Sequence, residues 1–334
     1  MKNLLLLICL LPALVFAQEP TPTPTAIPIP NLAKWESQMV QYATPLCNEA
    51  AINAALTSST QDERNVWYYD GTRTFQQVAN YTGNPDWNRC AGYVANAYMT
   101  YVTGFRTGGW RVFPHGLYDY FVRTQDQRAS VALHDLATIS AFADKPPDPA
   151  WSNSWEYSRE IAYILQSYIY HTKIDGAVHS QLSLALGDAL GHMDQWFVTK
   201  TAPIVKPFMV GLTAEALITY YEQVEQDPRI LPAIRTAADW MWTNAWVPSA
   251  RAFKYGAGKC SGKYGRECSQ PPAADLNMLI APMYAWLWKQ TGEAKYLEQG
   301  DQAFSGAVDL AWLGQGKQFN QTYRWSFKYV EWRK

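Results

Sequence analysis

The sequence predicts an all-α protein in which pairs of antiparallel helices close into a ring. Long stretches place apolar residues at helical spacing, as Ile230, Ile234, Ala237 and Met241 do within 229–246. Similar short turns separate these stretches, and signals for β-strands are sparse. Hydrophobic residues make up 48% of the 334, which is enough for a sizeable buried core.

The separating turns carry the signals that start a helix. Asn84 or Asp227 is expected to cap the next helix, and Pro85 or Pro228 follows at its first position, where the missing N–H costs nothing. Solvent-exposed turns of this kind predict one end of the ring. They lie at 82–87 (TGNPDW), 124–128 (TQDQR), 224–229 (VEQDPR) and 291–296 (TGEAKY).

Burial patterns predict that inner and outer helices alternate. Residues 161–170 and 210–221 are apolar nearly all round, as expected of helices covered on every side. Pro282 should kink the fifth inner helix or delay its start. An open helical solenoid is the alternative, but repeats of roughly 42 to 67 residues are uneven for that architecture. Inner helices are expected at about 72–82, 115–124, 157–172, 208–224, 275–291 and 321–332, and outer helices at about 32–43, 86–104, 126–143, 179–198, 229–246 and 293–311.

The first thirty residues predict export. Lys2, an apolar run over 4–16 and a small-residue cleavage site ending at Ala17 are typical of a signal peptide at 1–17. Residues 18–30 alternate Pro and Thr, which predicts an extended linker. A single ring-shaped domain is expected over 31–334. No second apolar run approaches membrane-spanning length, so no membrane insertion is expected after cleavage.

Charge and cysteine content limit the function classes. Loss of Lys2 leaves 27 basic residues against 29 acidic ones, a charge of about −2, and no basic face points to nucleic acid. Four cysteines remain in the mature chain. Cys260 and Cys268 bracket a short loop and are expected to pair, and Cys47 with Cys90 follows by elimination. No metal-ligand spacing or phosphate loop occurs, so neither a metal nor another cofactor is expected.

Two segments resemble the hairpins of a known architecture. Residues 208–215 (FMVGLTAE) followed by 237–240 (AADW), and 275–277 (DLN) leading into 284–287 (YAWL), are similar to hairpins of the (α/α)6 toroid. Six-hairpin glycosidases and toroid polysaccharide lyases have this fold. The resemblance covers roughly residues 60–334 and implies a carbohydrate-active enzyme, although no family-defining catalytic motif matches.

In such a ring the N-termini of the inner helices gather at one end, which in proteins of this architecture is the active cleft. Helix N-termini also supply positive potential there. Aromatic residues at that end could stack on sugar rings while polar groups bind hydroxyls. The candidate substrate-binding residues at these junctions are Tyr69, Asp70, Arg73, Trp155, Tyr157, Arg159, Asp194, Gln195, Trp196, Asn277, Asn320 and Arg324.

Hydrolysis of a glycosidic bond requires two carboxyl groups, one acting as an acid and the other as a base or nucleophile. Glu160 and Asp275 are the candidates, with Asp70 and Asp194 in reserve. Each has a structural alternative: Glu160 in an ion pair with Arg159, Asp275 as a helix N-cap, and Asp194 in a local contact.

Elimination on a uronate polymer requires a base and a group that neutralises the uronate carboxyl. His115, His192 and Tyr323 are the further catalytic candidates, supported by Asn277, Asn320, Arg324 and Arg159. The polar cluster at 320–325 either bridges the first and last hairpins or lines the cleft, because burying it unpaired would be costly. His134, His171 and His179 are expected to have no functional role.

The favoured function is a secreted or periplasmic, monomeric enzyme that hydrolyses a polysaccharide or oligosaccharide. A polysaccharide lyase is the close alternative, and a non-catalytic glycan-binding toroid is the third.

Overall fold

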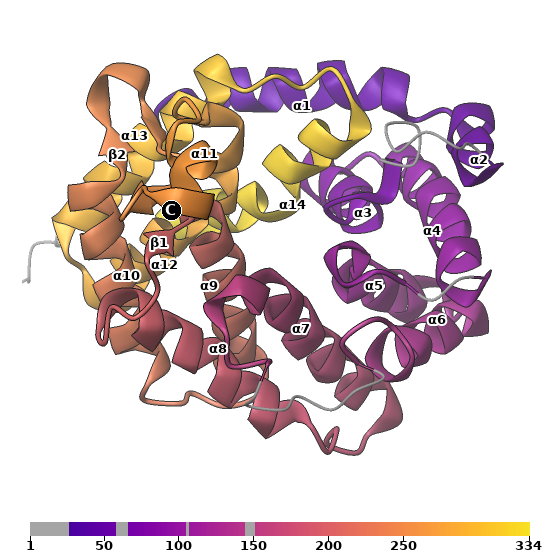
Figure 1. Ribbon diagram of the computed structural model, residues 1–334. Coiled ribbons are helices and arrows are strands. Elements are labelled where there is room, and N and C mark those ends of the chain that lie inside the picture. The colour runs from indigo at the N-terminus through magenta and orange to yellow at the C-terminus, as the bar shows by residue number, and fades with distance from the viewer. Residues whose placement is uncertain (1–26, 58–65, 105–106, 144–150) are drawn as a thin grey trace, which may run out of the picture.

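The computed structural model describes residues 27–57, 66–104, 107–143 and 151–334, and within them the helices form a closed ring (Figure 1). Each inner helix packs against the next, and the last packs against the first. The predicted all-α toroid is therefore confirmed. The inner helices are α3 (Gly71–Thr82), α5 (Pro114–Thr124), α7 (Ser158–Asp175), α9 (Pro207–Gln223), α12 (Ala281–Thr291) and α14 (Gly316–Arg333).

A second layer of helices surrounds the first. The N-terminal helix α1 contacts both α14 and α3, so the two ends of the chain meet where the ring closes (Figure 1). The outer helices are α1 (Leu32–Leu46), α4 (Asp86–Gly104), α6 (Gln127–Thr138), α8 (Leu182–Phe197), α10 (Ile230–Asn244) and α13 (Ala294–Leu310).

Short elements fill the connections. Strand β1 (Ile204–Val205) pairs with β4 (Ala257–Gly258), and β2 (Trp246–Val247) pairs with β3 (Ala252–Phe253), both antiparallel. The short helices are α2 (Glu49–Thr57), α11 (Gly265–Cys268), and the 3-10 turns η2 (Gly109–Arg111), η3 (Trp155–Tyr157), η4 (Pro248–Ala250), η5 (Gly262–Tyr264) and η6 (Ala274–Leu279).

Several helix boundaries differ from the sequence-based expectation. Helix α12 starts only at Ala281, because Pro282 occupies its first turn and the preceding residues form η6 instead. Helix α14 starts five residues earlier than expected, at Gly316, and α6 ends at Thr138 rather than 143. The apolar spacing in the sequence identifies the buried middle of a helix but not the residue at which its polar end stops. Helix ends are therefore harder to predict than helix middles.

The helix-starting turns use the expected side chains. Asn84 Oδ1 accepts a hydrogen bond from the backbone N–H of Asp86 at 3.0 Å, and Asp227 Oδ1 accepts one from Arg229 at 2.9 Å. Helix α4 begins at Asp86, directly after Pro85, whereas α10 begins at Ile230 with Arg229 at its N-cap position and no side-chain cap, so Asp227 stabilises the turn but does not cap the helix as expected.

Two side chains of α14 close the ring. Asn320 donates to the backbone carbonyls of Val66 and Tyr68 at 3.1 and 3.0 Å. Tyr323 donates its hydroxyl proton to the carbonyl of Trp35 in α1 at 2.9 Å. Of the two roles expected for the 320–325 cluster, these contacts supply the bridge between the first and last hairpins.

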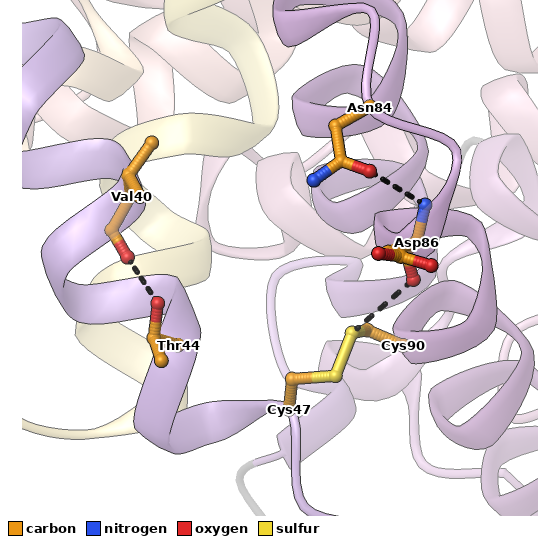
Figure 2. Close-up of a disulfide and its surroundings, with 6 residues drawn as sticks. All are labelled: Val40, Thr44, Cys47, Asn84, Asp86 and Cys90. Atoms are coloured by element: carbon orange, nitrogen blue, oxygen red, sulfur yellow. Dashed lines mark hydrogen bonds between the residues drawn. A yellow bond between two sulfur atoms is a disulfide. The ribbon is translucent and has the colours of Figure 1, made fainter.

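The predicted disulfides are both present, and one of them fixes α2 to the ring. Cys47 follows α1 and bonds to Cys90 in α4, as Figure 2 shows. Cys260 bonds to Cys268 across eight residues. The predicted signal peptide lies outside the described residues, and of the predicted linker only 27–30 are described. There the carbonyl of Ile27 accepts a hydrogen bond from Arg333 at 3.3 Å.

No helix within the described ranges is both long enough and apolar enough to cross a bilayer.

We predict that the double variant Cys47→Ser, Cys90→Ser lowers thermal stability more than Cys260→Ser, Cys268→Ser does. The first disulfide spans 43 residues and the second spans eight, so the first restricts the unfolded chain more. The loop-entropy relation gives about 4 kcal/mol for the longer loop and about 2.5 kcal/mol for the shorter. Differential scanning calorimetry measures both, and an equal or reversed order would contradict the prediction.

Candidate functional site

The N-terminal ends of the inner helices meet at one end of the ring, which we call the mouth. The Tyr68 and Phe113 rings lie 5.6 Å apart, and the Phe113 and Tyr163 rings 5.5 Å apart, so the starts of α3, α5 and α7 are in contact. Trp155 in η3, directly before α7, lies 5.8 Å from Tyr264 in η5, which belongs to the connection between α10 and α12. The mouth is thus a shared surface built from several hairpins.

An unusual backbone leads into the mouth. Tyr69 and Asp70 both adopt left-handed conformations, with φ of 58° and 65°. Such conformations are strained for residues other than glycine and persist only when their surroundings fix them. Asp70 supplies that fixation: its carboxylate accepts from the N–H of Arg73 at 3.2 Å and of Gly116 at 3.0 Å, which ties α3 to α5.

Gly116 is required for this contact. A Cβ atom there would lie 2.2 Å from the Asp70 carboxylate and 2.4 Å from the backbone nitrogen of Arg73. The predicted substrate-binding residue Asp70 is therefore only 3% exposed, and both of its carboxylate oxygens hold the backbone.

Below the mouth, an ion-paired triad crosses the axis of the ring. Glu215 in α9 accepts from Arg73 in α3 at 2.5 Å and from Arg324 in α14 at 2.7 Å. All three side chains are at most 2% exposed. A buried charge is tolerated only when it is paired, and each oxygen of this carboxylate has its own guanidinium partner.

Arginines and tyrosines line the mouth above the triad. The Arg324 guanidinium lies over the rings of Tyr69 and Tyr163, at 6.0 and 5.9 Å from their centroids. Arg159 donates two hydrogen bonds to Glu160 Oε1, at 3.1 and 2.6 Å. The ion pair considered as the structural alternative for Glu160 is therefore present, although only one of the two carboxylate oxygens takes part.

Several buried donors here lack an acceptor. Arg324 Nε and Nη1 and the Tyr163 hydroxyl make no hydrogen bond to any described residue, although both side chains are at least 98% buried. An unpaired buried donor costs about 1–3 kcal/mol. These groups are therefore suited to an anionic or hydroxyl-bearing ligand, or to ordered water.

The mouth tyrosines are poor bases. Burial raises the pKa of Tyr68, Tyr69 and Tyr163 above the usual value, and the positive charge of Arg159, joined by Arg324 for Tyr69 and Tyr163, offsets this only in part. All three hydroxyls are thus protonated at neutral pH and act as hydrogen-bond donors.

Beyond the triad the axis continues into a second polar region. His115 Nε2 lies 3.4 Å from Asp119 Oδ2, one helical turn along α5, and the His115 ring packs on Tyr170 at 4.8 Å. Burial raises the pKa of Asp119 to about 6, and burial together with nearby Arg73 lowers the pKa of His115 well below its usual value. His115 therefore lies further along the axis than Arg159 and Glu160.

Two predicted site residues use their polar groups for structure. Asn277 is fully buried: its amide oxygen accepts from Phe253 at 3.2 Å, and its nitrogen donates to the carbonyls of Arg251 and Ala303. Tyr323 is also fully buried and bonded to Trp35. The structure does not bring these two residues to the mouth.

The predicted site residues of α8 lie on the outer layer. His192 is fully buried with Nε2 2.7 Å from the carbonyl of Ser152, and burial lowers its pKa to about 4. Gln195 also holds that loop, accepting from the backbone N–H of Trp155 at 3.3 Å. Trp196 is buried, and Asp194 is exposed and lines a groove between α8 and α10.

Three further predicted residues lie on or near the rim. Trp155 is buried in η3, and Tyr157 is 38% exposed and packs against Phe142 and Trp151. Asp275 is half-buried in the first turn of η6, and its carbonyl accepts from Gln321 at 2.5 Å. Its carboxyl group does not cap α12, which begins six residues later.

Sequence reasoning missed Glu215, Tyr163 and Asp119. The signal for Glu215 was present, because it is the only charged residue within the apolar stretch 207–221. An acid in a helix covered on all sides must have a partner, and the complementary arginines lie on other inner helices. Tyr163 gave no signal, because a tyrosine in an apolar helix is usually a core residue.

No group of three or more His, Cys, Asp or Glu side chains in the described segments is arranged to hold a metal ion.

We predict that Glu215→Gln lowers the free energy of unfolding by about 3–5 kcal/mol, since it leaves Arg73 and Arg324 buried without a counter-charge. Glu298→Gln, a neutralisation on the exposed outer surface, is the matched control and should have little effect. Chemical denaturation measures both variants. If Glu215→Gln were as stable as the wild type, the ion-paired triad would not contribute to the stability of the ring.

We also predict that Asp119→Asn stabilises the protein at pH 7.5 but not at pH 4. The folded-state pKa of about 6 lies above the ordinary value, so ionisation disfavours the folded state as pH rises through 4 to 6. The side chain is 38% exposed, so solvent screening limits the gain to about 1 kcal/mol. Melting temperatures across this pH range test it, and a gain independent of pH would contradict it.

Comparisons with known proteins bear on the fold. No protein-family model matches the sequence, and no curated protein is similar to it in sequence. Among solved structures, the crystal structure of an unsaturated glucuronyl hydrolase specific for heparin is similar, with a TM-score of 0.64 and 9% sequence identity. The match covers 89% of this chain and 97% of that chain. At this identity the likeness is one of fold, and this chain shares its helical toroid with that hydrolase.

Proposed function

We propose that this chain is an exported enzyme that hydrolyses a glycosidic bond in an acidic oligosaccharide or polysaccharide. The observation that carries the proposal is the set of unpaired buried donors of Arg324 and Tyr163 below a mouth that also holds Arg159. The two disulfides fit an oxidising compartment outside the cytoplasm.

The arginines suit a carboxylate on the substrate. Arg324 keeps one nitrogen on Glu215 and has Nε and Nη1 free of protein partners in the described chain. The N–H groups of Nε and Nη1 lie on different edges of the guanidinium, so each can donate to a separate acceptor of an acidic sugar, such as a carboxylate oxygen and a hydroxyl. The structurally similar protein is described as an unsaturated glucuronyl hydrolase, which agrees with a negatively charged sugar as the substrate.

The tyrosines suit the rest of the sugar. Tyr68 is half-buried at the mouth, and its ring contacts Tyr69 at 4.8 Å and lies 5.5 Å from the ammonium of Lys317. A ring of this kind offers an apolar face for sugar C–H groups, and protonated hydroxyls donate to sugar oxygens.

Glu160 and Asp275 supply the two carboxyl groups in this proposal. Asp275 gives a proton to the glycosidic oxygen as the bond from the anomeric carbon to that oxygen breaks. A water molecule attacks the anomeric carbon, and Glu160, which is ion-paired with Arg159, takes the proton that the water loses. The products are two sugars that together contain the atoms of the substrate and one water.

Hydrolysis is favoured over elimination by the protonation states at the mouth. An eliminating enzyme needs a base that removes a carbon-bound proton. The raised pKa values of Tyr68, Tyr69 and Tyr163 make these residues unsuitable. His192 and His115 are both neutral, but His192 is fully buried on α8, away from the axis, and His115 lies beyond the triad beside Asp119.

Elimination is the second candidate because Arg159 and Arg324 could equally neutralise a uronate during proton abstraction. The two reactions differ in their products: hydrolysis consumes a water, whereas elimination leaves an unsaturated uronate of unchanged total mass.

We predict that glucuronate-containing oligosaccharides are cleaved with the uptake of one water, and that Glu160→Gln and Asp275→Asn each reduce kcat at least a hundredfold, as loss of a general acid or base does. Mass spectrometry of the products measures the first result, and steady-state kinetics the second. Glu49→Gln, on the exposed surface of α2, is the control that should retain activity.

Unchanged circular dichroism in both variants would show that the loss is chemical. Full turnover by either variant would remove that residue from the mechanism. Products of unchanged total mass that carry a double bond would replace hydrolysis with elimination.

A further inference from the structure

A separate hollow lies at the rim of the mouth, beside the start of α9. It has a volume of about 400 Å³ and is lined by Lys206, Tyr255, Arg266, Glu267 and Gln270. The lining contains two cations, one carboxylate, an amide and an aromatic ring. We propose that this hollow is a second saccharide subsite that binds an anionic group, a carboxylate or sulfate, on a sugar residue beyond the cleaved bond. This inference rests on the proposed function.

Tyr255 lines the hollow and also packs against the start of α9. The ring of Tyr255 packs 5.3 Å from that of Phe208 in the first turn of α9. It is also close enough to Tyr69 for the two phenol groups to influence each other electrostatically. Tyr255 therefore lies between the two regions, and a chain of two or more sugars could contact both.

The charge of the hollow favours an anion. The Lys206 ammonium lies 3.4 Å from Glu267 Oε1, which accounts for one positive and one negative charge. Arg266 is exposed and forms no ion pair with any residue in the described ranges, so it leaves the hollow with one net positive charge. Lys206 also has three N–H donors, of which this ion pair uses one.

The loop that carries Arg266 is held in place from several sides. The disulfide between Cys260 and Cys268 closes it, and the β1–β4 pairing joins its start to the residues before α9. At its tip, Lys263 and Tyr264 both donate to Glu156 in η3 at 3.0 Å. A loop fixed before the ligand arrives loses little conformational freedom on binding, so its contacts contribute more to affinity.

The size and lining fit a sugar residue. The volume falls in the range of small-molecule sites, about 300–1,000 Å³. Half-buried Tyr255 offers a ring face for stacking, and the Gln270 amide can both donate to and accept from hydroxyl groups. A cation, an amide and an aromatic ring together are the groups that an acidic sugar requires.

The test compares hyaluronan fragments of two lengths, the disaccharide and the tetrasaccharide, with wild type and Arg266→Ala. Isothermal titration calorimetry measures the Kd of each fragment, so the test does not require turnover. We expect Arg266→Ala to weaken tetrasaccharide binding about tenfold, as loss of one solvent-accessible charged hydrogen bond does, and to leave disaccharide binding unchanged. Lys259→Ala, an exposed lysine on the same segment that does not line the hollow, is the control.

A neutral tetrasaccharide, cellotetraose, tests the role of charge and should show no effect of Arg266→Ala. If Arg266→Ala alters both hyaluronan lengths equally or neither, the rim subsite is refuted. If hydrolysis fails but the length-dependent loss of binding is observed, the subsite stands and the proposed reaction does not. If wild type binds neither fragment, both proposals fall.

Discussion

The pairing of one carboxylate with two guanidinium groups at the axis is the constraint on which the rest of the ring depends. Six inner helices arranged in a ring leave a space along the ring axis, because their backbones cannot all approach it closely. Side chains must therefore fill that space. Glu215, Arg73 and Arg324 do this from three different helices, and each is nearly inaccessible to solvent. Removing charges from water is costly, and the reciprocal pairing offsets that cost while setting the relative positions of α3, α9 and α14.

That pairing also divides the axis into two chemically different regions. On the mouth side, two nitrogens of Arg324 have no hydrogen-bond acceptor among the described residues, and the neighbouring Tyr69 and Tyr163 stay protonated at neutral pH. On the other side, His115 is kept neutral, and the pKa of Asp119 is raised to about 6, so this carboxyl ionises only as the pH approaches neutrality. The positive ends of the inner helices face the mouth as well, so an anionic ligand is favoured at this end.

The sequence predicted the ring because a ring is mostly a matter of periodicity and turns. Helix α4 starts and ends where its apolar spacing and the Asn84 turn indicate, and the covered helix α9 differs by a single residue at each end. The cysteine pairing also followed from the residue count and loop length.

The side-chain directions did not follow from that pattern. Asp194, Gln195 and Trp196 stand at the expected end of α8, yet their side chains hold a loop, fill the core or face the outer surface. A junction residue can point toward the axis or away from it, and a shift of one residue on a helix turns a side chain by about 100°. Glu215 was missed for the related reason that its partners are distant in sequence and visible only once the ring closes.

The same reasoning explains how a toroid can keep its fold while its sequence changes almost completely. At 9% identity to the glucuronyl hydrolase, little beyond helical patterning can be shared. The core requires only apolar side chains of suitable volume, which many sequences supply. The mouth is different, because some of its groups, such as Tyr68, Trp155 and Tyr264, come from the connections between helices, where a substitution need not disturb the packing of the core. Arg266 illustrates the point: its loop is held by its own disulfide and by Glu156, so its identity could vary without altering the axis. Substrate choice in this protein is therefore expected to depend on the connections, and stability on the buried charges beneath them.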